Sequence, residues 1–130
     1  MAENKNSSEE KLRYMENMLQ RAVTDSPIPV MVYADDGEVL QISKTWMDLS
    51  GYDREEISNI RDWCRRAYRE KSDAVLKDIW RLFDLTGKKH EGEYIVTTKQ
   101  GTRCIWDFSS TPLGVLPDGR RIVMSIAYDV

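Results

Sequence analysis

The chain has 130 residues, which is enough for one domain with a hydrophobic core. Its formal net charge is −3, so it carries no field that favours nucleic acid as a partner. No apolar run approaches the ~20 residues of a membrane-spanning helix, and the polar start lacks the apolar stretch of a signal peptide. Cys64 and Cys104 stand without a CxxC pair or a histidine-rich neighbourhood, which argues against a metal site or disulfides and favours a cytoplasmic location.

The first predicted element is an amphipathic helix over residues 7–24, preceded by a polar tail. Ser7 and Glu10 have the spacing of a capping box, and Asp25-Ser26-Pro27 ends the helix. Apolar residues recur in it at the a and d spacing of a coiled coil, namely Leu12, Met15, Leu19 and Ala22. Two interpretations stay open: the helix packs on the chain's own sheet, or it pairs with its copy in a homodimer.

Two short strands and a short helix follow. The strands are predicted over residues 29–34 and 38–42, with Asp35-Asp36-Gly37 as the turn between them. Ser43 is the predicted N-cap of the short helix, and Gly51 supplies the left-handed residue that ends it.

The stretch before the next strand is predicted to be helical in pieces. Asp53-x-x-Glu56 repeats the capping spacing at the start of one or two short helical turns. Ser72 is the predicted N-cap of a longer helix over residues 73–85. The apolar stripe of that helix consists of Val75, Leu76, Ile79, Leu82 and Phe83.

The last third of the chain predicts three strands in an antiparallel meander, over residues 93–98, 102–111 and 121–128. Tyr94 and Val96 in one strand, and Trp106 and Phe108 in the next, have the period-two spacing of side chains on one sheet face. The helix over residues 73–85 is expected to cover that face, with Trp106 against Ile79 or Phe83. The fold class is therefore α+β, a five-stranded antiparallel sheet with helices on one face and an N-terminal flanking helix.

From Asp25 onward the chain resembles a PAS domain, the sensor module of bacterial and archaeal signal-transduction proteins. The order and spacing of several segments carry the resemblance: Asp36-Gly37, Leu49-Ser50-Gly51-Tyr52-Asp53-Arg54-Glu55-Glu56-Ile57, Glu93-Tyr94, Lys99-Gln100-Gly101, Trp106 and Ala127-Tyr128-Asp129-Val130. The resemblance divides the chain into residues 1–24, a tail and amphipathic helix, and residues 25–130, the PAS domain. It implies a sheet and helices that enclose a pocket, used for a small ligand or cofactor or filled by side chains.

Three departures from the family pattern bear on these expectations. Ser43 stands where the family often has Asn, and it can cap a helix equally well. Gln100-Gly101 stands where Asp-Gly is common in the hairpin turn. The chain ends at Val130, where the family usually continues through a helix into an output domain such as a histidine kinase or a cyclase.

The sequence argues against the two familiar PAS cofactors. Cys64-Arg65 invites comparison with the flavin-reactive cysteine of LOV photosensors, but the flanking residues of that motif are missing, so a structural cysteine is expected. His90 is the only histidine, whereas haem-binding PAS domains usually carry their iron ligand on the long helix, here residues 73–85. His90 is therefore expected in a surface loop.

No catalytic residues are predicted, because a nucleophile with its base and orienting group cannot be assembled around a single histidine. An enzyme of the ketosteroid-isomerase kind would need a buried acid that faces a tyrosine across the pocket. Asp107 is the candidate acid, and strand alternation should point it away from the pocket.

The favoured interpretation is a non-enzymatic sensory module that detects a small ligand or a partner's state and relays it through terminal helices to an output domain. The alternative is a PAS-fold dimerisation module that binds nothing small. Residues expected in the core or along a ligand pocket are Trp46, Leu76, Ile79, Phe83, Tyr94, Val96, Trp106, Phe108 and Met124.

Overall fold

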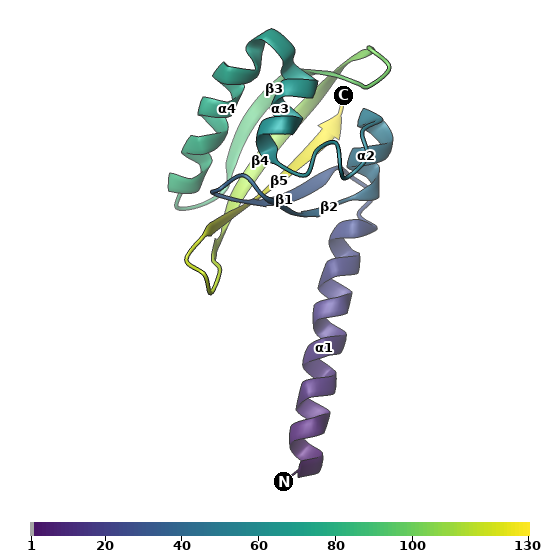
Figure 1. Ribbon diagram of the computed structural model, residues 1–130, viewed down its shortest axis with the longest axis vertical. Coiled ribbons are helices and arrows are strands. Elements are labelled where there is room, and N and C mark those ends of the chain that lie inside the picture. The colour runs from purple at the N-terminus through teal and green to yellow at the C-terminus, as the bar shows by residue number, and fades with distance from the viewer. Residues whose placement is uncertain (1) are drawn as a thin grey trace.

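The computed structural model of the chain describes the backbone of residues 2–130 and the side chains of residues 7–130 (Figure 1). One antiparallel sheet has the strand order β2-β1-β5-β4-β3. Its strands are β1 (Val30–Ala34), β2 (Val39–Ile42), β3 (Lys89–Thr97), β4 (Arg103–Val115) and β5 (Arg121–Asp129). The helices are α1 (Ala2–Thr24), α2 (Lys44–Ser50), α3 (Ile60–Tyr68) and α4 (Ser72–Arg81), with short 3₁₀ turns η1 (Arg69–Lys71) and η2 (Leu82–Asp84).

The predicted α+β architecture is confirmed. Helices α2, α3 and α4 cover one face of the sheet, and β3, β4 and β5 form the expected meander (Figure 1). Between residues 2 and 130 there is no helix whose length and apolar character would let it span a lipid bilayer.

Helix α1 projects away from the sheet, and its C-terminal end lies beside β2 (Figure 1). It starts at Ala2, so the prediction that Ser7 caps it is wrong. Ser7 lies inside the helix, where backbone amides find intrahelical carbonyls and need no side-chain cap. The prediction that the helix ends at Thr24 is correct.

Ser43 caps α2 as predicted. Its hydroxyl oxygen accepts from the amide of Trp46 at 3.2 Å and from the amide of Val30 at 2.9 Å, and the hydroxyl donates to the carbonyl of Ile28 at 3.2 Å. Gly51 closes the helix with φ +81°. One buried hydroxyl therefore joins the start of β1 to the start of α2.

In the stretch after α2, the capping box predicted at Asp53 and Glu56 is present, whereas the predicted N-cap at Ser72 is wrong. Asp53 and Glu56 make the reciprocal bonds of a capping box, at 2.9 and 3.1 Å, but on a turn that does not continue into an α-helix. Ser72 is the first residue of α4 and makes no capping bond, because the 3₁₀ turn η1 leads directly into the helix. Helix α4 ends at Arg81, and η2 follows it.

Three tryptophans fill the space between the sheet and the helices. Trp106 of β4 stacks on Trp63 of α3 at 5.7 Å between ring centroids and meets Trp46 of α2 edge-on at 5.4 Å. Phe83 instead meets Tyr33 at 5.7 Å. The expected contact of Trp106 with Phe83 is therefore wrong, because α3, with its own tryptophan, lies over this part of the sheet; the expected contact with Ile79 stays a prediction.

The expected inward position of Met124 is also wrong. On β5 the buried residues Val123, Ser125 and Ala127 alternate with half-buried ones. Since successive strand side chains point to opposite faces, Met124 lies on the face away from α2, α3 and α4. The period-two pattern predicts the inward residues of β4 correctly, but on β5 the inward residues lie one position away from the predicted Met124.

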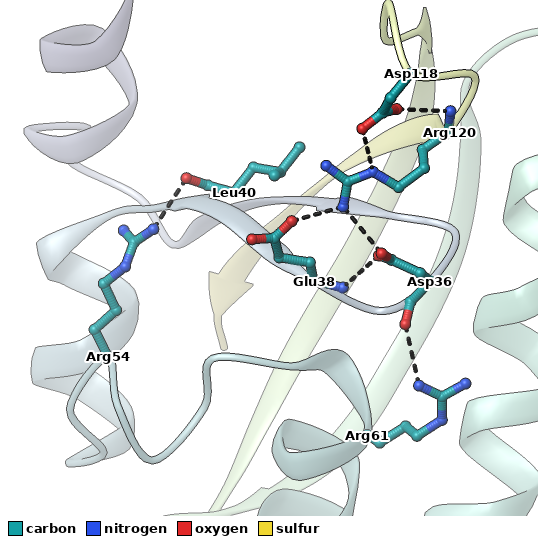
Figure 2. A network of polar contacts seen from close by, with 7 residues as sticks. All are labelled: Asp36, Glu38, Leu40, Arg54, Arg61, Asp118 and Arg120. Atoms are coloured by element: carbon teal, nitrogen blue, oxygen red, sulfur yellow. Dashed lines mark hydrogen bonds and ion pairs between the residues drawn. The ribbon is translucent and has the colours of Figure 1, made fainter.

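A polar network holds the turns at one end of the sheet together (Figure 2). Arg120 donates to Asp36 at 3.0 Å, to Glu38 at 2.6 Å and to Asp118 at 2.9 Å, so it joins the β1–β2 turn to the β4–β5 turn. Arg61, at the start of α3, donates to the backbone carbonyl of Asp36 at 3.1 Å. The network lies at the surface, and its role is to hold the two turns in place relative to each other.

Candidate functional site

A small cavity lies between the inner face of the sheet and helices α3 and α4. It encloses about 20 Å³, which is room for a single water molecule. Four of the predicted pocket residues line it, namely Trp46, Ile79, Tyr94 and Phe108. Phe83, Val96 and Trp106 are buried elsewhere in the same core, and Leu76 packs against it. The aromatic side chains thus fill most of the space that the fold encloses.

The wall of the cavity carries a chain of polar side chains that the sequence analysis missed. Tyr33 and Ser125 share a hydrogen bond of 2.9 Å, and Ser125 and Ser110 share one of 2.6 Å. The Ser110 hydroxyl then donates to Glu91 at 2.5 Å. The chain of hydrogen bonds runs from β1 through β5 and β4 to β3, and it brings a carboxyl group to the edge of a core of aromatic and aliphatic side chains.

Two of these residues left a trace in the sequence. Ser110 and Ser125 occupy inward positions of strands whose other inward residues are apolar, so a polar side chain there signals a buried hydrogen bond. Glu91 left none. The register of β3 shifts between His90 and Gly92, and this bulge brings Glu91 to Ser110, whereas plain alternation from Tyr94 points Glu91 outward.

Burial dominates the electrostatics of the cavity. It raises the pKa of the Glu91 carboxyl, and the hydrogen bond from Ser110 opposes this only in part. Burial also raises the pKa of Tyr33 and Tyr68, so both phenols keep their protons. Trp46 adds a further polar atom, because its Nε1 is buried with no hydrogen-bond partner among the described residues.

Cys64 and His90 occupy structural and surface positions. Cys64 is buried on α3, and burial raises the pKa of its thiol to about 12. His90 is exposed as expected, but on β3 and not in a loop, with its Nε2 at 2.6 Å from Asp107 Oδ1. Asp107 therefore points away from the cavity, as alternation predicted. Among residues 7–130, no three His, Cys, Asp or Glu side chains group closely enough to hold a metal ion.

Helix α1 presents the second candidate site. Its apolar stripe is open to solvent, with exposed fractions of 60% for Leu12, 44% for Met15 and 65% for Leu19. Ala22 is exposed as well. The interpretation in which this helix packs along its own sheet is therefore wrong, and the stripe has no partner within the described part of the chain.

These features define a class of domain, one in which a five-stranded antiparallel sheet and a layer of helices enclose a small cavity, with a free helix at the N-terminus. The PAS domain family model matches residues 27–130, so the chain belongs to the PAS domain family.

Solved structures of PAS domains share the fold. The PAS domain of an HTR-like protein from Haloarcula marismortui is 15% identical, with a TM-score of 0.72 over 96% of this chain and 99% of that one. A domain of a sensory box sensor histidine kinase/response regulator from Geobacter sulfurreducens is 22% identical, with a TM-score of 0.68 over 91% and 96%. The PAS domain of Bordetella pertussis BvgS is 13% identical, with a TM-score of 0.70 over 89% and 86%. A search of functionally curated proteins found no match.

Proposed function

We propose that the chain is a sensory module that receives a small ligand or a partner at the cavity side of its sheet and passes the state to an output domain through α1. The exposed apolar stripe of α1 carries this proposal, because residues 7–130 of a single molecule provide it with no partner. The Geobacter sulfurreducens neighbour comes from a sensor histidine kinase/response regulator, which favours a histidine kinase as the output domain over the alternative of a cyclase.

The coupling between cavity and α1 rests on α2. Trp46 of α2 lines the cavity, and the first residues of α2 hold the chain just after α1. Thr45 Oγ1 donates to the carbonyl of Ser26 at 2.6 Å, and Lys44 Nζ lies 3.2 Å from Asp25 Oδ1. A shift of α2 that follows a change in the cavity would therefore move the base of α1.

The stripe on α1 is proposed to pair two copies of the chain. An isolated helix is marginally stable in water, so burial of its apolar stripe favours the folded helix. Leu12, Met15 and Leu19 from two chains, at about 1.5 to 3 kcal/mol for each fully buried side chain, contribute roughly 9 to 18 kcal/mol. Association costs about 4 to 15 kcal/mol. The expected dimer is therefore weak, with a dissociation constant in the micromolar range or above, and is easily rearranged by a signal.

Sedimentation velocity on the intact chain tests the pairing. The parent should dimerise reversibly, and Leu19→Lys should stay monomeric because it places a charge in the stripe. Gln20→Lys is the matched control, since it adds the same charge to the neighbouring, exposed position outside the stripe. A parent that remains monomeric at about 100 micromolar, or a Leu19→Lys protein that dimerises like the parent, contradicts the proposal.

A dimerisation module without a small ligand is the second candidate, and the filled core favours it. Trp46, Trp63 and Trp106 occupy the volume that a large ligand would need and leave about 20 Å³. Native mass spectrometry of freshly purified protein separates the two candidates, since a retained small molecule supports the sensory function and its absence from fully folded dimers supports the alternative.

Two further points belong to the proposal. A non-catalytic role is favoured because the described lining of the cavity places no histidine and no second acid beside Glu91. A cytoplasmic location is favoured because a buried thiol at Cys64 and a half-buried one at Cys104 suit a reducing compartment.

A further inference from the structure

Glu91 is a carboxyl group without a cation. It lines the cavity, its residue is only partly exposed, and its one hydrogen-bond partner among the described side chains is Ser110. No described lysine, arginine or histidine nitrogen lies within 4.0 Å of its oxygens, although Lys89 is near enough to act on it electrostatically. A carboxylate withdrawn from water is costly unless it is paired, so this position favours a positively charged guest.

The remaining wall of the cavity suits the same charge. Six aromatic side chains line it: Tyr33, Trp46, Trp63, Tyr68, Tyr94 and Phe108. The faces of aromatic rings attract ammonium groups, and they do so most strongly where water is excluded. One carboxylate within an aromatic enclosure is therefore a cation-binding arrangement, and a volume near that of one water molecule sets the size of the charged group at a primary ammonium.

A shallow cleft outside the cavity offers room for the rest of a guest. The cleft has a volume of about 160 Å³ and lies between α4, η2 and β3, where Asp78, Arg81, Leu82, Lys89, Glu91 and Tyr94 line it. Glu91 and Tyr94 belong to both the cleft and the cavity. Tyr94 is half-buried, with its ring edge-on to Tyr68 at 6.0 Å and to Phe108 at 5.7 Å. A turn of this ring would join the two spaces.

We infer that this site binds a small primary amine, with its ammonium group at Glu91 inside the aromatic wall and its short carbon chain in the cleft between α4 and β3. The inference rests on the proposed sensory function and names the ligand class for it. Asp78 in the cleft lies 3.7 Å from the Arg81 guanidinium and is already paired, so Glu91 supplies the charge that attracts the ammonium group, and Arg81 and Lys89 disfavour a second positive charge on the guest. A quaternary ammonium group is too large for the inner space, so the site discriminates by size as well as by charge.

The test is a titration of the intact 130-residue chain with n-butylammonium chloride, followed by calorimetry and by the indole signals in NMR spectra. Saturable binding of n-butylammonium is expected, at least tenfold tighter than binding of pentan-1-ol, a neutral probe of similar length, or of tetramethylammonium. Sodium chloride at matched ionic strength corrects for screening. Equal binding of the alcohol, or no saturable response to the amine up to about 20 millimolar, overturns the inference.

Glu91→Gln separates charge from shape, because the amide oxygen still accepts from Ser110. This variant should bind n-butylammonium at least tenfold more weakly, whereas Glu55→Gln, which removes an exposed carboxylate elsewhere, should bind it like the parent. Unchanged affinity in Glu91→Gln overturns the inference. Sedimentation velocity on the same samples keeps the two proposals apart, since loss of amine binding leaves α1 pairing intact, and a monomer that still binds the amine refutes only the pairing.

Discussion

Cys64 is buried on α3, and its burial should make the thiol unreactive. Because burial raises its thiol pKa to about 12, the thiolate that attacks disulfide reagents is scarce at neutral pH. We expect Cys64 in the native parent to react with such a reagent at least tenfold more slowly than after denaturation in urea. Cys104→Ser isolates Cys64 for this measurement. Equal rates in the native and unfolded states would place Cys64 at the surface and contradict its packing on α3.

Glu91 should give the fold a pH dependence of its own. Its pKa is raised by burial, so the folded chain holds this proton more tightly than the unfolded chain does. Its contribution to stability is therefore complete below the ordinary glutamate pKa and is lost as pH rises through the raised value. Glu91→Gln should accordingly gain stability relative to the parent between about pH 4 and pH 7.5.

Urea unfolding of both proteins at the two pH values checks this. The quantity to compare is the difference in stability between parent and variant at each pH. Asp36, Glu56 and Asp118 have lowered pKa values, so their contributions to stability are lost as pH falls, which is opposite to the behaviour of Glu91. If the parent instead becomes more stable relative to Glu91→Gln as pH rises, the pKa of Glu91 is not raised, and the burial of this carboxyl is contradicted.

Trp106 is fully buried and lies at the centre of the tryptophan cluster. Trp106→Ala should lower the free energy of unfolding by about 3 to 5 kcal/mol, the usual effect of emptying a large aromatic site. Its Nε1 has no hydrogen-bond partner in the described part of the chain, so this loss is one of packing and not of a hydrogen bond. Ile105→Ala, at the neighbouring exposed position, should change stability by about 0.5 kcal/mol. Similar losses for the two variants in urea titrations would contradict the assigned sheet face.

At the scale of elements, the two serines that both fit the sequence pattern of an N-cap should behave differently. Ser43→Ala removes the cap of α2 and leaves the amide of Val30 without its acceptor, so we expect a loss of about 1 to 2 kcal/mol. Ser72→Ala should be close to neutral, because Ser72 makes no capping bond. Thermal or urea unfolding of the two variants measures the contrast, and equal losses would show that Ser72 caps α4 after all.

The sequence predicts most elements here because their determinants are local. The cap at Ser43, the left-handed Gly51 and the period-two runs of β3 and β4 each act within a few residues, and each is present in the structure. The errors arise where distant parts of the chain decide. Whether Trp106 meets α3 or α4 depends on how two helices share one sheet, and Glu91 reaches the cavity through a bulge that alternation does not reveal.

The candidate site is predictable only in part, because some of its determinants are local and others depend on distant parts of the chain. Its aromatic wall follows from the strand pattern at Tyr94 and Phe108 and from the short helix that carries Trp46. Its polar chain joins four strands and depends on register, which no single stretch of sequence encodes. Gly92, with φ +99°, marks the bulge that turns Glu91 inward, and with the inward serines Ser110 and Ser125 it is a local trace of that arrangement.

At the scale of the whole molecule, we expect the PAS domain to fold stably without α1 but to dimerise only when α1 is present. Helix α1 projects from the sheet (Figure 1), and the segment that joins it to the domain is held by contacts at Asp25 and Ser26, beyond the end of the helix. A protein of residues 25–130 retains these contacts and the whole tryptophan core. Its melting temperature at low concentration should therefore lie within about 3 °C of that of the intact chain.

Concentration should then distinguish the two proteins. If α1 pairs two chains, mass action makes the melting temperature of the intact protein rise with protein concentration, whereas that of residues 25–130 should stay constant. Gln20→Lys should follow the intact parent, and Leu19→Lys should follow the shortened protein. A concentration dependence that survives removal of α1 would assign the interface to the sheet instead. Its outer face exposes Ile95, Ile105 and Leu113, and Ile105→Lys would be the variant that then abolishes it.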